Sequence, residues 1–137
     1  MATILYVDDE QAIGNAVQTW LERRGAAVHR ANSLESARRL VARHAFDGAF
    51  IDVWLGDGTG FELYEHIAEA QPGLASRTAF ITGDAVPRED VARRLAELGR
   101  PVIAKPFDLS TLDGWVATWT APAAREPGAA ADTPQAP

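Results

Sequence analysis

The sequence contains no cysteine, a single methionine and a single lysine, Lys105. Without cysteine the chain has no disulfide bond, no thiolate metal site and no catalytic thiol, and it suits a reducing cytoplasm. It also lacks an apolar run of membrane-spanning length and a basic amino-terminal segment that would mark a secretion signal. We therefore expect a soluble, cytoplasmic protein that makes no membrane contact.

An excess of positive charge is missing as well. The formal net charge is −6, and arginines occur in scattered pairs, Arg23-Arg24, Arg38-Arg39 and Arg93-Arg94. Because nucleic-acid binding needs clustered cations to neutralise phosphates, we expect no nucleic-acid partner. With 137 residues, 47% of them hydrophobic, the chain is long and apolar enough for one globular domain with a core.

Five short apolar runs rich in β-branched or aromatic residues predict β-strands. They span Thr3–Val7, Ala26–Arg30, Gly48–Val53, Thr78–Thr82 and Pro101–Ala104. Stretches with helical spacing alternate with them, and their apolar faces lie within Ile13–Leu21, Leu34–Val41, Phe61–Ala68, Val91–Leu98 and Leu109–Trp119. Ser33 is a candidate N-cap, and Gly25 and Gly99 are candidates for ending helices.

Strict alternation of strands and helices predicts an α/β fold, with a parallel sheet covered by helices on both faces. Right-handed crossovers leave few topologies. Five such units match the flavodoxin-like (βα)5 doubly wound parallel sheet with strand order 2-1-3-4-5. We assign residues 1–120 to this domain. Residues 121–137 are rich in alanine and proline and have no apolar periodicity, so we expect a disordered tail there.

Polar residues follow four of the five predicted strands. The first strand ends in Asp8-Asp9-Glu10, the third in Asp52, the fourth in Thr82 and the fifth in Lys105. Parallel strands have their carboxyl ends at one edge, where such sheets bind ligands, so Asp8, Asp9 and Asp52 should converge. Crowded carboxylates repel unless a cation lies between them, and Mg²⁺ is the natural partner for carboxylate oxygens. Lys105 would add the remaining positive charge, and the Thr82 hydroxyl can donate to an anionic oxygen.

Each of these residues also has a simpler interpretation. Asp9 could serve only as the N-cap of the first helix, Thr82 could belong to a turn, and Lys105 could be a chance surface residue. Asp52 is harder to explain in this way, because a charge on an apolar strand costs free energy unless it is paired. A carboxylate beside a divalent cation and a lysine can act as a nucleophile toward phosphorus, and Asp52 is the best candidate.

The ordered motifs resemble the receiver domain of two-component response regulators, the CheY-like superfamily. The matching stretches are Ile4–Glu10, Phe50–Asp52, Phe80–Gly83 and Lys105–Phe107. The resemblance implies that Asp52 accepts a phosphoryl group from a phosphohistidine of a sensor histidine kinase or a histidine phosphotransfer protein. It implies Mg²⁺ bound directly by Asp9, Asp52 and the Trp54 carbonyl, and by Asp8 through water. Thr82 and Lys105 would contact the phosphoryl oxygens.

Three positions that matter in the family carry unusual or variable residues here. Val102 stands where the family usually has tyrosine or phenylalanine, so the aromatic switch that reports phosphorylation is absent. Trp54 and Asp84 occupy positions that tune the lifetime of the phosphoryl group in the family. We expect the Trp54 indole to shield the aspartyl phosphate from water, or else to pack on the third helix. Asp84 would aim a water molecule or cap the fourth helix.

These residues favour a single-domain response regulator that relays a signal through phosphorylation-dependent contacts with a downstream protein, since few residues follow Trp119. It would be a phosphoryl acceptor with slow self-dephosphorylation rather than a turnover enzyme. A receiver segment of a hybrid histidine kinase or phosphorelay is an alternative, as is a pseudo-receiver without chemistry. An aspartyl-phosphate hydrolase of the haloacid-dehalogenase type is disfavoured. That family needs Asp-x-Asp on its first strand, where this chain has Asp8-Asp9.

Overall fold

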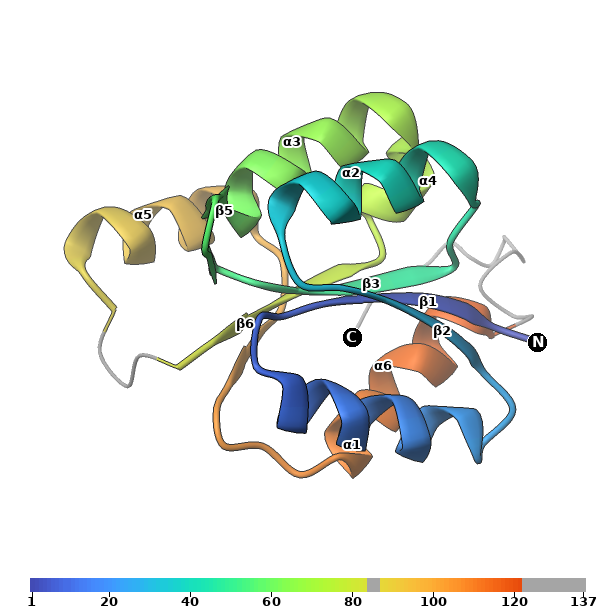
Figure 1. Ribbon diagram of the computed structural model, residues 1–137. Helices are drawn as coiled ribbons and strands as arrows, with labels where there is room; N and C mark the ends of the chain where they lie inside the picture. The colour runs from blue at the N-terminus through green and yellow to red at the C-terminus, as the bar shows by residue number, and fades with distance from the viewer. Residues whose placement is uncertain (84–86, 122–137) are drawn as a thin grey trace.

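A five-stranded parallel sheet forms the centre of the computed structural model, which describes residues 1–83 and 87–121 (Figure 1). Its strands are β1 (Thr3–Val7), β2 (Ala27–Ala31), β3 (Gly48–Asp52), β6 (Thr78–Thr82) and β7 (Val102–Ala104). They lie in the order β2-β1-β3-β6-β7, and every neighbouring pair is parallel. Counted along the chain, these five strands have the order 2-1-3-4-5, so the predicted flavodoxin-like topology is confirmed.

Helices cover both faces of the sheet. On one face, below the sheet in Figure 1, lie α1 (Gln11–Glu22) and α6 (Ser110–Thr120). On the other lie α2 (Leu34–Arg43), α3 (Gly60–Ala70), α5 (Glu89–Leu98) and a short α4 (Pro72–Ala75) that the sequence did not predict. Across the described ranges, no helix has both the length and the apolar character needed to cross a membrane. The tail expected to be disordered lies outside the described residues from position 122 onward.

The sheet divides the core into two apolar clusters. Successive side chains of a strand point to opposite faces, and β1 shows this directly. Leu5 and Val7 join the cluster beneath α2 and α3, whereas Ile4 and Tyr6 join the cluster with α1 and α6. All five residues of β3 are buried, since both faces of this central strand are covered. Asp52, at the end of β3, therefore carries its charged side chain in poorly hydrated surroundings.

Local signals explain two helix ends and correct the interpretation of a third. The Ser33 hydroxyl accepts the Ser36 N–H at 3.1 Å and begins α2, as predicted. Gly99 ends α5 with a φ of 65°, a left-handed conformation that glycine adopts at low cost. The N-cap position of α1 is Glu10, without a side-chain cap, so the interpretation of Asp9 as an N-cap is wrong.

The two tryptophans of α6 are half-buried against the sheet. The Trp119 ring lies 5.0 Å, centroid to centroid, from Phe50, and 6.0 Å from Trp115. This approach needs Gly48, because a Cβ atom there would overlap the Trp119 ring. Both indoles therefore contribute to the core.

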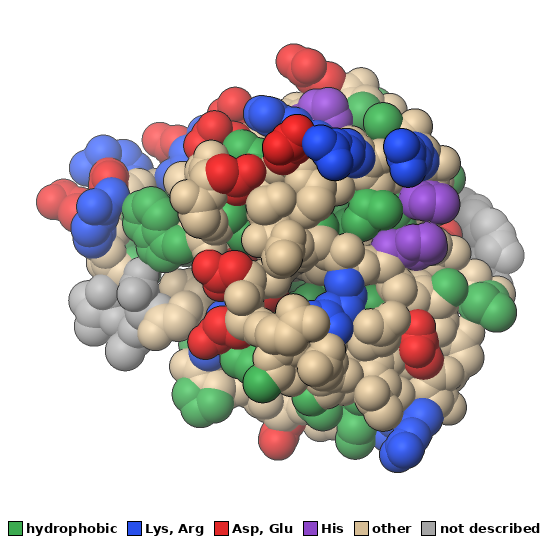
Figure 2. Space-filling view, viewed as in Figure 1, with side chains coloured by type: hydrophobic (Ala, Val, Ile, Leu, Met, Phe, Trp, Pro, Cys, Tyr) green, Lys and Arg blue, Asp and Glu red, His purple; other side chains and the backbone are tan. Residues whose placement is uncertain are grey.

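The visible surface mixes charges of both signs. Figure 2 shows acidic and basic side chains interspersed over the helical face that carries α2, α3 and α5. Short ion pairs connect several of them, including Arg39 with Glu35 at 2.7 Å and Arg94 with Glu65 at 2.8 Å. Exposed pairs of this kind contribute little to stability, so the fold depends on its core.

Candidate functional site: an acidic cluster with one lysine

The predicted strand-end residues meet at the carboxyl edge of the sheet. Asp8 follows β1 directly, Asp52 ends β3, Thr82 ends β6 and Lys105 follows β7. One carboxylate oxygen from each of Asp8, Asp9 and Asp52 lies within 4.8 Å of the others. Asp8 and Asp52 are buried, whereas Asp9 is exposed. The structure thus brings together the three acids that the strand order predicts at this edge.

Lys105 places its ammonium among these carboxylates. Its Nζ lies 3.0 Å from Asp8 Oδ2, 3.1 Å from Asp52 Oδ2 and 2.6 Å from Glu10 Oε1. Burial by itself would lower the pKa of Lys105, but hydrogen bonds to Glu10, Asp8 and Asp52 hold this pKa above its ordinary value. With a side chain only 15% exposed, Lys105 is not a chance surface residue, and that interpretation is wrong.

Burial strongly affects the ionisation of Asp52. Desolvation raises the pKa of Asp52 to about 6, against the opposing effects of Lys105 and of a backbone hydrogen bond. The donor of that bond is the Trp54 N–H, which lies 3.2 Å from Asp52 Oδ1. The charge of Asp8 adds to the repulsion. Asp52 is therefore ionised at neutral pH, but its negative charge is held at a cost that a further cation would relieve.

Two contacts of Asp8, with Tyr6 and with the backbone of Glu10, were not predicted from the sequence. The Tyr6 hydroxyl donates to Asp8 Oδ2 at 3.1 Å, and the Glu10 N–H donates to Asp8 Oδ1 at 2.9 Å. Burial and then the charge of Asp8 raise the pKa of Tyr6 above its ordinary value, so its hydroxyl keeps its proton. The available signal was spacing, since residues two apart in a strand project from the same face. A tyrosine within an apolar run is equally typical of a core position, which concealed it.

The segment after Asp52 forms a small antiparallel hairpin of β4 (Trp54–Leu55) and β5 (Gly58–Thr59). In its turn, the Asp57 carboxylate accepts the N–H groups of Leu34 and Glu35 at 2.7 and 3.1 Å. These two bonds from the first turn of α2 hold the pKa of Asp57 below its ordinary value. On the other side, a capping box at Thr59 leads directly into α3. The hairpin that carries Trp54 is therefore fastened to two helices.

The remaining predicted positions surround the cluster. Trp54 is 40% exposed. Arg88, at the start of α5, places its guanidinium carbon 5.1 Å from the centroid of the Trp54 ring. Thr82 is buried, and its carbonyl accepts the Lys105 N–H at 2.8 Å, which aligns β7 with β6. Val102, which replaces the expected aromatic residue, is 45% exposed. Asp84 lies outside the described residues.

The donor set of the cluster suits a hard divalent cation. Asp8, Asp9 and Asp52 offer three carboxylate oxygens in close proximity, and Mg²⁺ prefers oxygen ligands of this kind. Their combined negative charge exceeds that of the Lys105 ammonium, and Glu10 shares that same ammonium. The cluster is thus an acidic site of the right chemistry and size to hold a metal ion.

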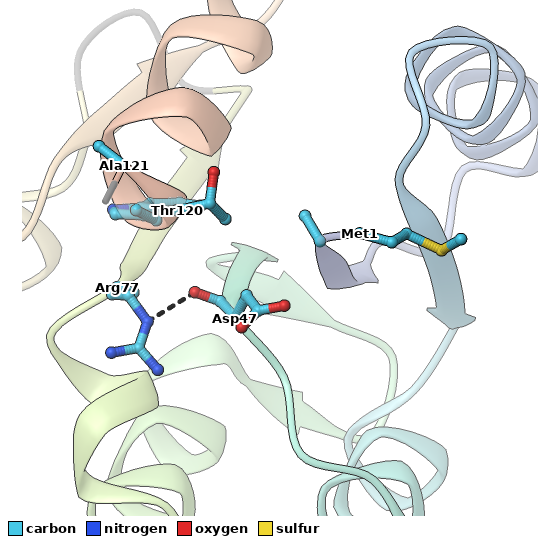
Figure 3. A pocket seen from close by; sticks show the side chains of 7 residues that line it. Met1, Asp47, Arg77, Thr120 and Ala121 are labelled. Carbon is cyan, nitrogen blue, oxygen red and sulfur yellow. Dashed lines mark hydrogen bonds between the residues drawn. The ribbon is translucent and has the colours of Figure 1, made fainter. Parts of the chain in front are cut away.

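A cavity of about 640 Å³ lies at the opposite edge of the sheet and takes no part in this site. Its lining includes Asp47 and Arg77, which precede β3 and β6 respectively (Figure 3). The Arg77 Nε–H donates to the Asp47 carbonyl at 2.6 Å, so one edge of this cavity is held by a structural hydrogen bond. Its lining combines residues that precede strands, such as Asp47 and Arg77, with the end of α6, whereas the acidic cluster lies where the strands end.

A parallel sheet in this order, with acids after β1 and at the end of β3 and a lysine after β7, has the architecture of a CheY-like receiver. The family model of the response regulator receiver domain matches residues 4–117. The chain therefore belongs to the response regulator receiver domain family. The resemblance drawn from its motifs is confirmed.

Individual relatives agree with this assignment. The response regulator protein PilR of Pseudomonas aeruginosa is 34% identical over 115 residues, which make up 83% of this chain and 25% of PilR. The chain thus spans about a quarter of the length of that relative. A CheY-like receiver domain protein from Methanospirillum hungatei JF-1 matches with a TM-score of 0.75 at 27% identity, covering 83% of this chain and 89% of that one. The non-phosphorylated HemR receiver domain from Leptospira biflexa gives a TM-score of 0.72 at 30% identity, covering 85% and 95%.

Replacing Asp52 with asparagine should stabilise the metal-free protein at neutral pH. Because folding raises the pKa of Asp52 from 3.8 to about 6, the folded state retains this proton to a higher pH than the unfolded chain does. The free energy of unfolding therefore falls as the pH rises from 3.8 to about 6. At higher pH it remains lower than it is below this range. Asparagine avoids the buried charge, so the free energy of unfolding should rise by at most roughly 3 kcal/mol.

Urea unfolding in EDTA measures this effect. We expect Asp52→Asn to be more stable than the wild type at about pH 7. The two proteins should be equally stable at about pH 4, where Asp52 of the folded wild type is neutral. A variant less stable than the wild type at neutral pH would contradict the inferred cost of the Asp52 charge.

Proposed function

We propose that Asp52 accepts a phosphoryl group from a phosphohistidine of a sensor histidine kinase or a histidine phosphotransfer protein. The observation that carries this proposal is the position of Lys105, whose Nζ lies 3.1 Å from Asp52 Oδ2 and 3.0 Å from Asp8 Oδ2. A buried carboxylate on the central strand, with an ammonium on one side and further acids beside it, suits reaction with an anionic phosphoryl group. Membership of the receiver family supports the same role.

The proposed transfer forms one bond and breaks another. An Asp52 oxygen attacks phosphorus while the phosphorus–nitrogen bond of the phosphohistidine breaks. The imidazole leaves with the bonding electron pair and then takes up a proton. Lys105 holds its positive charge beside the accepting carboxylate, and Thr82 offers a hydroxyl from the neighbouring strand β6. Phosphoryl transfer depends mainly on this kind of positioning and charge neutralisation.

Asp8, Asp9 and Asp52, with the Trp54 carbonyl, would hold Mg²⁺, which when bound neutralises oxygens of the transferred group. A response regulator protein from Burkholderia pseudomallei offers a parallel at 26% identity and a TM-score of 0.73. Its crystal structure contains a phosphorylated aspartic acid, a calcium ion and citrate. We extend this combination of aspartyl phosphate and divalent cation to Asp52 and its neighbours as part of the proposal.

The chemistry of the cluster disfavours the two rival functions. A pseudo-receiver has no need of three acids, Asp8, Glu10 and Asp52, in contact with one ammonium. A hydrolase of the haloacid-dehalogenase type would carry Asp-x-Asp, including its nucleophile, on the first strand. Here the two acids after β1 are adjacent, and the candidate nucleophile is Asp52 at the end of β3. We therefore propose a phosphoryl acceptor instead of a turnover enzyme. Its phosphorylated and unphosphorylated forms would differ in the surface that they present to a downstream protein.

Phosphorylation by a small donor tests this function. With Mg²⁺ and acetyl phosphate, we expect one phosphoryl group per wild-type chain, bound as a hydroxylamine-sensitive acyl phosphate. Asp52→Asn should remain unlabelled, and EDTA should slow the labelling at least roughly tenfold. Asp108→Asn, which changes an exposed acid close to Lys105 in sequence, is the matched control and should be labelled like the wild type. Labelling that persists in Asp52→Asn, or sustained turnover of phosphate esters, would contradict the proposal.

Trp54 provides a second test, of the lifetime of the acyl phosphate. Its indole lies two residues beyond Asp52 and 5.1 Å from the Arg88 guanidinium carbon, so we propose that it limits the approach of water. Trp54→Asn should therefore dephosphorylate several-fold faster, and Trp54→Phe, which keeps an aromatic ring, should remain closer to the wild type. The decay of labelled protein after removal of the donor measures these rates. Equal rates in all three proteins would contradict shielding.

A further inference from the structure

The Tyr6 hydroxyl is a polar group placed in an otherwise apolar part of the core. Tyr6 is only 1% exposed and belongs to the cluster that includes Ile4, Val17 and Leu112. Phenylalanine would supply nearly the same ring to this packing without a polar atom. A buried hydroxyl costs free energy unless it is hydrogen-bonded, and the partner of this one is Asp8 Oδ2 at 3.1 Å. The hydroxyl therefore adds nothing to the apolar packing, and its contribution is the hydrogen bond to Asp8.

The donors around Asp8 differ in how firmly they are held. Asp8 Oδ1 accepts the Glu10 N–H at 2.9 Å, and Oδ2 receives both the Tyr6 hydroxyl and the Lys105 ammonium. Lys105 has a flexible side chain, and it divides its contacts among Asp8, Asp52 and Glu10. The Tyr6 ring is fixed by the core, and the Glu10 N–H is fixed by the backbone. If Lys105 turned toward a phosphoryl group, these two donors would still hold Asp8.

We propose that Tyr6 is a positioning residue for the divalent cation, acting through Asp8. Its hydroxyl holds one carboxylate oxygen and so fixes the side chain in the orientation that faces Asp9 and Asp52. This role rests on the proposed function, because it assumes that the acidic cluster binds Mg²⁺ during phosphorylation. Groups that orient metal-binding side chains in this way commonly contribute about tenfold or more to metal affinity.

Tyr6→Phe and Tyr64→Phe form a matched pair, since these are the two tyrosines of the chain. Tyr64 is half-buried on α3, and its ring lies 5.6 Å from Phe80, away from Asp8 in the other cluster. Titration of each protein with Mg²⁺, followed by intrinsic tryptophan fluorescence and by the thermal unfolding midpoint, gives its Mg²⁺ dissociation constant. We expect roughly tenfold weaker binding for Tyr6→Phe, and wild-type affinity for Tyr64→Phe.

A purely structural role for Tyr6 predicts a different result. It would lower the unfolding midpoint in EDTA and leave the Mg²⁺ dissociation constant unchanged, which would overturn the proposal. Tighter Mg²⁺ binding by Tyr6→Phe would overturn it as well. The rate of labelling by acetyl phosphate gives a second readout. Its half-saturating Mg²⁺ concentration should rise about tenfold in Tyr6→Phe, with a smaller change in the rate at saturation.

The two proposals can fail separately. A wild type that binds Mg²⁺ but is never labelled on Asp52 would refute the proposed function, while the fluorescence titration would still decide the role of Tyr6. A wild type that is labelled normally, with Tyr6→Phe showing the same Mg²⁺ dependence, would refute only the role of Tyr6. A wild type without any response to Mg²⁺ would overturn both.

Discussion

The contact of one ammonium with several carboxylates organises this protein. Lys105 reaches Asp8 and Asp52 at 3.0 and 3.1 Å, and these two acids are buried at the ends of neighbouring central strands. Without a cation between them, two buried carboxylates would repel each other and favour unfolding. The ammonium offsets part of that repulsion, yet the pKa of Asp52 remains raised to about 6. The site is therefore stable enough to fold, and it retains an unbalanced negative charge that favours a second cation.

The rest of the architecture positions this cluster. Parallel pairing of β1, β3, β6 and β7 brings four polar strand ends to one edge of the sheet. The β4–β5 hairpin beside Asp52 is held by the Asp57 carboxylate on the first turn of α2. The ring of Tyr6 packs in the apolar core, and its hydroxyl donates a hydrogen bond to Asp8. Asp52 ends β3, and Asp8, Asp9 and Lys105 lie within two residues of the ends of β1 and β7, so the sheet sets the positions of these charged groups.

Much of this arrangement could be predicted from the sequence, and the remainder shows where periodicity fails. The strands were predictable because each is a short apolar run, and strand order then placed Asp8, Asp9, Asp52 and Lys105 at one edge. The β4–β5 hairpin was missed because its two-residue strands are too short to show a period. Spacing places Tyr6 on the same face as Asp8, but whether their side chains meet depends on side-chain conformation, as does the contact of Glu10 with Lys105. Asp9 fitted an N-cap pattern, yet α1 begins one residue later than that pattern requires.

We propose that Lys105 and a divalent cation neutralise the same carboxylates, so each opposes the binding of the other. Calorimetric titration with Mg²⁺ tests this directly in the wild type, in Lys105→Gln, which lacks the charge, and in Lys105→Arg, which keeps it. Removal of a positive charge next to Asp8 and Asp52 should tighten Mg²⁺ binding roughly tenfold in Lys105→Gln. Lys105→Arg should stay near the wild type. Equal or weaker Mg²⁺ binding by Lys105→Gln would contradict the account.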